Sequence, residues 1–496
     1  MFIKDVWNRL AGFFRRRAMN EQGQQAAAED KAGVARQQVI AQARRYYRGE
    51  QGVQLTERQR EFLGFQQGGG FRANYCRMVV NAVHERLIVS GFSSDEAPTA
   101  EGEQPTARWA ARLWRVNRGD ALQFVVHRDA VRDGEVFVLV DPTGVGGEAA
   151  FPVLAPHPRY VDPRHGGSGF GIRAYYDNDD PRQGMQYVAK WWTEEVEEEG
   201  AAGGRRREQR QRMTLYFPER IERYVWQRGA RSGWVEYREE GQAWPVAWMD
   251  RQGRALGIPV IHFQNPEQVS ELADAVPVQD AINKTLLDII AAADACGIPV
   301  RWSNEFLTTD GRPPADDGSN YLAITPGCII TVQGEKARLE NLEGGDLGPL
   351  LQTYNELVLT LARITDTPLS RFQTTRQVAA EGTLKQQEAP LLSKVRARQV
   401  FFGNAWEDVL AMARRLAVEF GGLNLAEDVS LETQWAPAET RDEPSIEEKL
   451  KAGVPQEQVW AEMGYTQEEI GAMKQMDEVR ARQAQRAAML ELAGGG

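Results

Sequence analysis

Two helix-forming stretches on either side of one polar insert constrain the fold of this chain more than any other feature of its sequence. The first stretch begins at Pro277 and ends just before Gly297. The second begins at Pro349 and extends to Ile364. Proline in the first turn and glycine after the last are typical of helix ends, and apolar residues recur at helical spacing in both stretches. The sequence therefore predicts two similar helices, the first about 20 residues or about 30 Å long.

The insert between the two helices, 298–347, is polar and β-like. Strand patterns occur at 298–304 (IPVRWSN) and at 328–332 (CIITV). The residues between these patterns are rich in Asp, Gly and Pro, which is typical of turns. We expect a small β structure between the two helices.

The N-terminal part of the chain predicts two further helices. The first covers 34–48, and Gly49 is its expected C-cap. In the stretch 72–92, apolar residues fall on one helical face, which predicts a buried helix that ends at Gly91.

The stretch 109–142 predicts two helices and then a strand at Val136–Val140, and short aromatic strands follow to about residue 265. Close turns between these strands favour an antiparallel sheet. Two runs of opposite charge, EEVEEEG and GRRREQRQR, lie between two of the strands. The simplest interpretation is a solvated hairpin tip, because the glutamates cancel the field of the arginines. The alternative is a nucleic-acid patch that consists of Arg205, Arg206, Arg207, Arg210 and Arg212.

The composition allows a packed core and disfavours some partners. The 496 residues are 42% hydrophobic and 26% charged, which is ordinary for a globular protein. The formal net charge of −11 argues against tight wrapping of nucleic acid, which needs surplus Lys and Arg, but it allows nucleic acid to slide past. No apolar stretch is long enough to span a membrane. The amphipathic pattern in 2–17 predicts a docking or packed helix, with membrane-surface contact as the alternative.

Residues that support enzyme chemistry form no recognised motif. The three cysteines are scattered, and none of the five histidines has a metal-ligand spacing. His127 and Asp129 could form an acid–base pair. Residues two apart on a helix point to different faces, however, so a structural hydrogen bond is favoured. The sequence therefore predicts no catalytic residue, no metal site and no cofactor.

A polar stretch at 367–380 follows the second predicted helix and leads into a long one. The apolar stripe of the long helix consists of Leu384, Leu391, Val395, Phe402, Trp406, Val409 and Leu416. Pro390 predicts a kink, because proline removes a backbone hydrogen bond. A strand at 429–435 and a charged helical tail from Ser445 follow.

Six segments in a characteristic order resemble the portal proteins of tailed bacteriophages, of the long-tailed, siphovirus type. They are YYRGEQ; RANYCRMVVNAVHERLIVSGF; RDAVRDGEVFVLVDP followed by HPRYVDP; IPVIHFQNPEQVSELADAVPVQDAINKTL; AAEGTLKQQEAPLLSKVRARQVFFGNAWEDVLAMARRL; and EEKLKAGVPQEQVWAEMGYTQEEIGAM. Each segment is weak alone, and the shared order from about residue 35 to the tail carries the resemblance.

The resemblance implies an α+β portal fold assembled as a ring, usually of twelve subunits. The N-terminal amphipathic helix and a flexible segment would occupy 1–30. The other parts would be a mixed wing at 31–275, a first stem helix at 276–297, a small β clip at 298–347, a second stem helix at 348–366, a tunnel loop at 367–380, a long kinked wing and crown helix at 381–420, and the helical crown with the C-terminal tail at 421–496.

In such a ring, terminase pumps DNA through the central channel, and the tunnel loop would face the duplex. Its expected DNA-facing residues are Thr367, Ser370, Arg371, Gln373, Thr374, Thr375, Arg376 and Gln377. Such side chains offer weak, replaceable hydrogen bonds and a modest positive charge, whereas dense cationic contacts would hold the phosphates in place. The alternative interpretation of this stretch is a surface linker.

The resemblance also implies partners and a location. The clip would dock the terminase large subunit and later a head-completion or adaptor protein, through Arg301, Asn304, Asp310, Arg312, Asp316 and Asp317. Further partners would be other copies of the chain, double-stranded DNA bound without sequence specificity, and the major capsid and scaffold proteins. The ring would lie at one capsid vertex of a virion assembled in the host bacterial cytoplasm, and DNA would later leave through it to the tail.

Two alternatives remain open. One is a structural head component without a channel, such as a capsid or adaptor protein. The other is a DNA-packaging enzyme, which would need a carboxylate cluster or Walker motifs that the sequence does not show.

Overall fold

The fold is described from a computed structural model of the chain. The described residues are 30–51, 57, 72–97, 104–141, 157–161, 171–177, 184–199, 205–227, 233–238, 243–297, 301–303, 339–341, 346–372, 381–426 and 428–439. The chain divides into two compact units, Met1–Ala438 and Glu439–Gly496, and the elements below belong to the first. The predicted N-terminal amphipathic helix and the charged tail from Ser445 lie outside the described residues.

The first predicted helix is confirmed as α3 (Asp30–Arg48). Gly49 follows it with φ +73°, a left-handed conformation that glycine adopts without steric cost. The second helix, α5 (Cys76–His84), buries the predicted apolar face. The prediction that this helix ends at Gly91 is wrong, because Gly91 lies in a strand.

That strand, β1 (Val89–Ser94), pairs antiparallel with β13 (Leu431–Trp435), which confirms the strand predicted near the C-terminal end. The ladder shifts register between Val89 and Gly91. Hydrogen bonds to a strand so distant in sequence override the local helical pattern, which is why periodicity misplaced the helix end.

The order helix, helix, strand predicted in 109–142 is confirmed by α6 (Pro105–Val116), α7 (Gly119–Asp133) and β2 (Glu135–Asp141). β2 is the central strand of a three-stranded antiparallel sheet, between β10 (Val260–Gln264) and β3 (His157–Val161). The expected aromatic strands therefore form two sheets, since β10 joins this sheet and not the larger one.

The larger antiparallel sheet has six strands and shares a buried apolar cluster with the three-stranded one, made of Phe137, Ile172, Val188 and Val260. Its strands are β4 (Ile172–Tyr176), β5 (Met185–Glu199), β6 (Arg205–Tyr216), β7 (Arg220–Trp226), β8 (Trp234–Glu236) and β9 (Val246–Ala247). The acidic and basic runs are cross-strand neighbours, and Glu197 lies opposite Arg207 while Glu199 lies opposite Arg205. This register confirms that the two runs belong to one hairpin of β5 and β6, whose tip lies outside the described residues.

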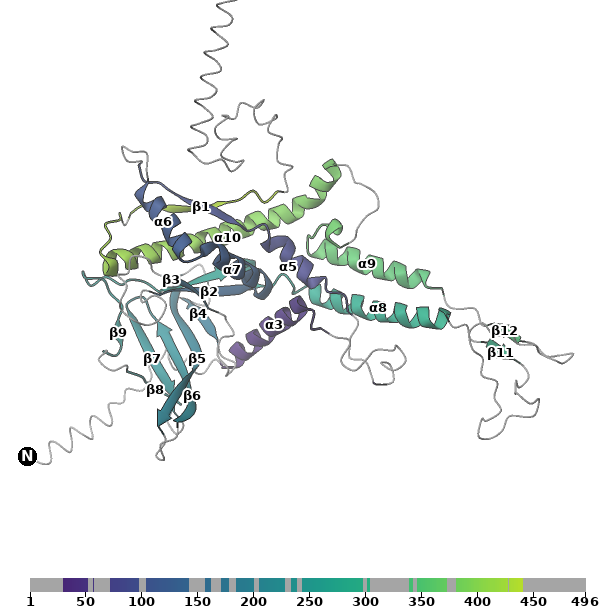
Figure 1. The fold of residues 1–496 in the computed structure, drawn as a ribbon, viewed down its shortest axis with the longest axis horizontal. Helices are drawn as coiled ribbons and strands as arrows, with labels where there is room; N and C mark the ends of the chain where they lie inside the picture. Colours follow the sequence, from purple (N-terminus) through teal and green to yellow (C-terminus); the bar gives the residue numbers. More distant parts are fainter. Residues whose placement is uncertain are drawn as a thin grey trace, which may run out of the picture. The chain divides into compact units, whose positions relative to one another are not determined.

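The two bounded helices that dominate the sequence are confirmed. α8 (Ala275–Gly297) and α9 (Gly348–Ile364) lie side by side in Figure 1, and the chain passes out along α8 and returns along α9. The insert between them includes an antiparallel pair, β11 (Arg301–Ser303) with β12 (Leu339–Asn341). The strand predicted at 298–304 is thus present, and the one predicted at 328–332 lies outside the described residues.

The long helix α10 (Glu381–Gly421) runs for 41 residues and includes Pro390. The six residues of its predicted stripe from Leu391 to Leu416 are each at most 1% exposed. They pack in one core with residues of α5, α7, β2 and β10. The kink expected at Pro390 stays a prediction.

His127 links α10 to α7 and is fully buried. Its Nδ1 lies 2.9 Å from the carbonyl oxygen of Leu87, and the indole Nε1 of Trp406 donates to its Nε2 over 2.8 Å. Since a carbonyl only accepts, Nδ1 carries the proton and the ring is neutral. Burial lowers the pKa of His127 to about 3. The structural interpretation of this histidine is confirmed, since Asp129 pairs with Arg128 and Arg132 instead.

Candidate functional site

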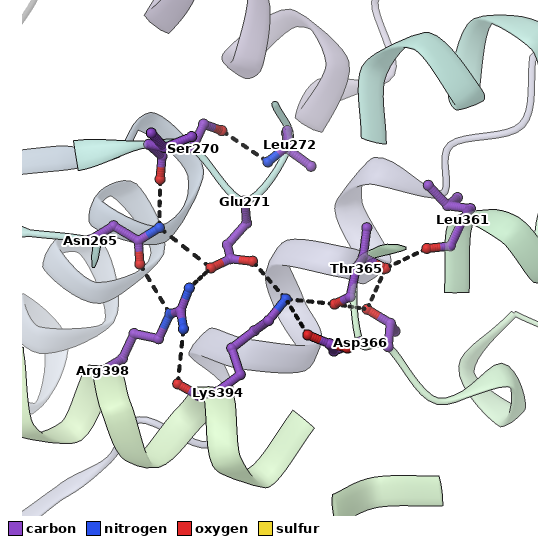
Figure 2. A network of polar contacts seen from close by, with 11 residues as sticks. Asn265, Ser270, Glu271, Leu272, Leu361, Thr365, Asp366, Lys394 and Arg398 are labelled. Atoms are coloured by element: carbon purple, nitrogen blue, oxygen red, sulfur yellow. Dashed lines mark hydrogen bonds and ion pairs between the residues drawn. The ribbon is translucent and has the colours of Figure 1, made fainter. Parts of the chain in front are cut away.

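Three chain segments meet where α8 and α9 join the main body (Figure 2). The segment 265–271 leads from β10 towards α8, and the segment 365–367 follows α9. The third segment is the turn of α10 over 394–398. We call the polar contacts among these segments the helix junction.

Lys394 contacts both other segments of the helix junction. Its Nζ donates to the carbonyl oxygen of Thr365 over 2.7 Å and lies 3.0 Å from Oε2 of Glu271. A carboxylate oxygen of Asp366 lies 3.7 Å away. The Lys394 side chain is only 13% exposed, and its ammonium group makes two hydrogen bonds, to Thr365 and Glu271, and a longer ion pair with Asp366.

Arg398, one turn further along α10, holds the segment before α8. Its guanidinium donates to the side-chain oxygen of Asn265 over 3.1 Å and pairs with Glu271. It also donates to the carbonyl oxygen of Lys394 over 3.1 Å. The Glu271 side chain is 6% exposed and has two cationic partners, which offset the cost of removing its charge from water.

The end of α9 is shaped by a reversal of the chain. Asp366 has φ +50°, which is uncommon for a residue other than glycine. The amide of Thr367 then donates to the carbonyl oxygen of Ala362 over 3.0 Å, and the Thr365 hydroxyl donates to that of Leu361 over 2.7 Å. The first bond satisfies a carbonyl group that the last turn of a helix leaves without a partner, and the second adds to the bond that the Thr365 amide already makes with Leu361.

The first three residues expected to face DNA, Thr367, Ser370 and Arg371, differ in their exposure to solvent. Thr367 is only 3% exposed and its hydroxyl contacts that of Thr365, so the expectation that it faces DNA is wrong for this residue. The reversal at Asp366 turns the Thr367 side chain inwards. Ser370 and Arg371 are exposed, and their contact with DNA stays a prediction. Gln373, Thr374, Thr375, Arg376 and Gln377 lie outside the described residues.

The segment from Pro368 to Phe372 packs against α5. The ring of Phe372 meets that of Tyr75 edge to face, with centroids 5.5 Å apart, and Arg371 lies 3.2 Å from Glu85. The Tyr75 hydroxyl is hydrogen-bonded to that of Tyr354 on α9, at 2.5 Å. Burial, followed by this hydrogen bond, raises the pKa of Tyr75, so the phenol stays neutral. The start of the loop is therefore fixed on the body of the protein.

The expected clip residues lie far along the chain from this junction. Arg301 is in β11, where its backbone pairs with Asn341. Asn304, Asp310, Arg312, Asp316 and Asp317 lie outside the described residues. Within the described part of the chain, no group of three or more His, Cys, Asp or Glu could hold a metal ion. No helix in that part is long and apolar enough to cross a bilayer.

Sequence reasoning missed Glu271, Lys394 and Arg398. Lys394 and Arg398 are four residues apart and therefore share one helix face, next to the buried stripe. Two cations bordering an apolar stripe were the available signal, but their partner Glu271 comes from a segment that no periodicity connects to α10.

No protein-family model matches the chain. Two curated proteins do. The portal protein of Mycobacterium phage D29 is 23% identical over 434 residues, which cover 82% of this chain and 79% of the relative. The portal protein of Mycobacterium phage L5 is 22% identical over 434 residues, with the same coverage of both chains.

A continuous match over 82% of the chain must include the two antiparallel helices, the insert and the first part of the long helix. The matches place the chain among the proteins of tailed bacteriophages. Within them, the chain is similar to portal proteins, and the two matches support a phage portal protein.

Proposed function

We propose that this chain is one subunit of a ring-shaped DNA channel at one vertex of a phage capsid. Terminase packages DNA through the channel, and DNA later leaves through it to the tail. The observation that carries the proposal is the match to two portal proteins across a region that contains α8, the insert, α9 and the first part of α10.

The parts of a portal subunit are assigned to elements of the fold as follows. Residues 31–275 form the wing, α8 and α9 form the stem, and 298–347 form the clip between them. Residues 367–380 form the tunnel loop. The long wing and crown helix covers 381–420, and the crown covers 421–496. The exposed apolar residues of α9 support an assembly, since Leu351 is 47% and Ile364 43% exposed. A helix that has apolar residues outside its packed face gains stability when a neighbouring subunit covers them. We expect about twelve copies in the ring.

The tunnel loop faces the duplex through Ser370, Arg371 and the residues of 373–377. Polar side chains that make brief contacts with phosphates let DNA advance, because each contact must break at every step. Thr367 is left out of this set, because it is buried at the helix junction.

The role is structural, and ATP hydrolysis belongs to terminase. The clip docks the terminase large subunit during packaging and an adaptor protein afterwards, with 301–317 as the contact region. The major capsid and scaffold proteins are further partners, and assembly takes place in the host bacterial cytoplasm.

Photo-crosslinking tests the channel directly. A photoreactive residue at exposed Ser370 should crosslink to DNA in particles stalled during packaging. The control is the same residue at exposed Gln252, next to Arg251, whose amide donates to Glu419 at the other end of α10. The rise of about 1.5 Å per residue puts that end about 35–40 Å from Lys394. Normal packaging without a crosslink at 370 would contradict the tunnel-loop assignment, and ATP hydrolysis by the purified chain would support the enzyme alternative.

A further inference from the structure

We propose that Lys394 is the residue that positions the tunnel loop, because it holds the end of α9 against the segment that leads into α8. The proposal rests on the function proposed above and adds a positioning residue to it. Lys394 does not itself face the duplex, since its side chain is 13% exposed and surrounded by protein oxygens.

The first step is that the end of α9 needs an external contact. Thr367 precedes Pro368, and a residue before proline is disfavoured in the helical conformation, so the helix stops here. The chain reverses at Asp366, which adopts a left-handed conformation that is unfavourable for a residue with a side chain. The direction in which the loop leaves α9 is therefore not fixed by the backbone of this segment alone.

Lys394 supplies such a contact at the end of α9 itself, in addition to the contacts that Arg371 and Phe372 make with α5 and Tyr75. Its ammonium group lies 2.7 Å from the carbonyl oxygen of Thr365, which is the C-cap residue of α9. A cation at this end of a helix meets the negative pole of the helix dipole. The same group is 3.7 Å from the carboxylate of Asp366, so it stabilises the residue whose backbone is least favourable.

The same ammonium group reaches the entrance of α8. It lies 3.0 Å from Glu271, four residues before α8 begins at Ala275. Glu271 also pairs with Arg398, which makes no contact with 365–367 in the network of Figure 2. Loss of the Lys394 charge would thus release the end of α9, while Glu271 would keep a cationic partner.

These contacts provide a matched pair of variants on one helix face. Lys394→Met removes the cation that contacts the end of α9. Arg398→Met removes the neighbouring cation, whose contacts in Figure 2 are Asn265, Glu271 and the carbonyl oxygen of Lys394. Both replace a long cationic side chain by an uncharged one of comparable length. A general loss of stability at the helix junction would affect both variants alike, whereas the positioning role distinguishes them.

The test is amide hydrogen exchange of the full-length protein, followed in peptides that cover 365–372. The amide of Thr367 donates to Ala362 in α9, and those of Arg371 and Phe372 donate within the segment, so all three report its order. A hydrogen bond to a charged group is strong enough that its loss should speed exchange there by about tenfold or more in Lys394→Met. Arg398→Met should leave exchange in these peptides within about twofold of the wild type.

A second substitution connects the effect to Asp366. Glycine adopts the left-handed conformation without steric cost, so adding Asp366→Gly to Lys394→Met should restore part of the protection. If Lys394→Met does not fold, Lys394→Gln keeps an N–H donor and should show a smaller increase in the same peptides. Equal acceleration in the Met variants at 394 and 398, or no acceleration in any variant of Lys394, would overturn the proposal. The measurement needs neither DNA nor terminase, so its failure is separate from failure of the channel function.

Discussion

Acidification should weaken the core beneath α10 through His127. The pKa of this buried ring is lowered from 6.5 to about 3 by burial, so the unfolded chain takes up a proton between these pH values while the folded chain does not. Stability is therefore fully present above about pH 6.5 and falls as the pH decreases towards 3. Below pH 6.5 the free energy of unfolding falls by about 1.4 kcal/mol per pH unit. The loss between about pH 7.5 and pH 5 is therefore about 2 kcal/mol. Protonation would also place two N–H donors opposite each other at Trp406.

Urea unfolding at several pH values measures this contribution as a difference between variants. His127→Gln carries no titrating group, so its stability should fall by about 2 kcal/mol less than that of the wild type over the same pH range. Phe402→Leu is the control, because the Phe402 ring stacks on His127 at 5.3 Å but does not titrate. Phe402→Leu should lower the free energy of unfolding at every pH and leave its dependence on pH as in the wild type. Equal slopes for the wild type and His127→Gln would refute the reasoning.

Two further changes test packing and backbone geometry. Leu391→Ala removes a fully buried side chain from the stripe of α10 and should cost about 2–5 kcal/mol in urea unfolding, while a loss below about 1 kcal/mol would show that this face is not core. Gly134→Ala should lower the melting temperature more than Gly253→Ala. Both glycines have positive φ, but an added Cβ at Gly134 would lie 2.5 Å from a backbone oxygen, whereas none of the described atoms lies within 4 Å at Gly253. Equal melting temperatures of the two variants would contradict this, because they would show that the backbone near Gly134 moves to accommodate the added Cβ without cost.

Features with local causes were predictable from the sequence. Proline and glycine bound α8, as predicted from Pro277 and Gly297, and the spacing of apolar residues identified the buried face of α10. The opposite charge runs predicted the hairpin of β5 and β6 because cross-strand pairing follows from a short turn. Each of these signals lies within one or two adjacent elements.

Features that depend on distant segments were not predictable. Gly91 was taken as a helix end because its partner, β13, lies more than 300 residues along the chain. Thr367 was expected to face solvent because its hydroxyl is polar, but the reversal at Asp366 turns it into the protein. The helix junction combines Glu271 and Lys394 from separate segments, and no single periodicity records such a contact.

The central claim is that copies of this chain close into a ring with a channel. Electron microscopy of the purified full-length protein, with its mass from light scattering, tests the claim most directly. The account predicts closed rings with a central hole and a mass near twelve times 55.6 kDa. Assemblies without a hole would contradict it, because the loop after α9 would then have no duplex to face.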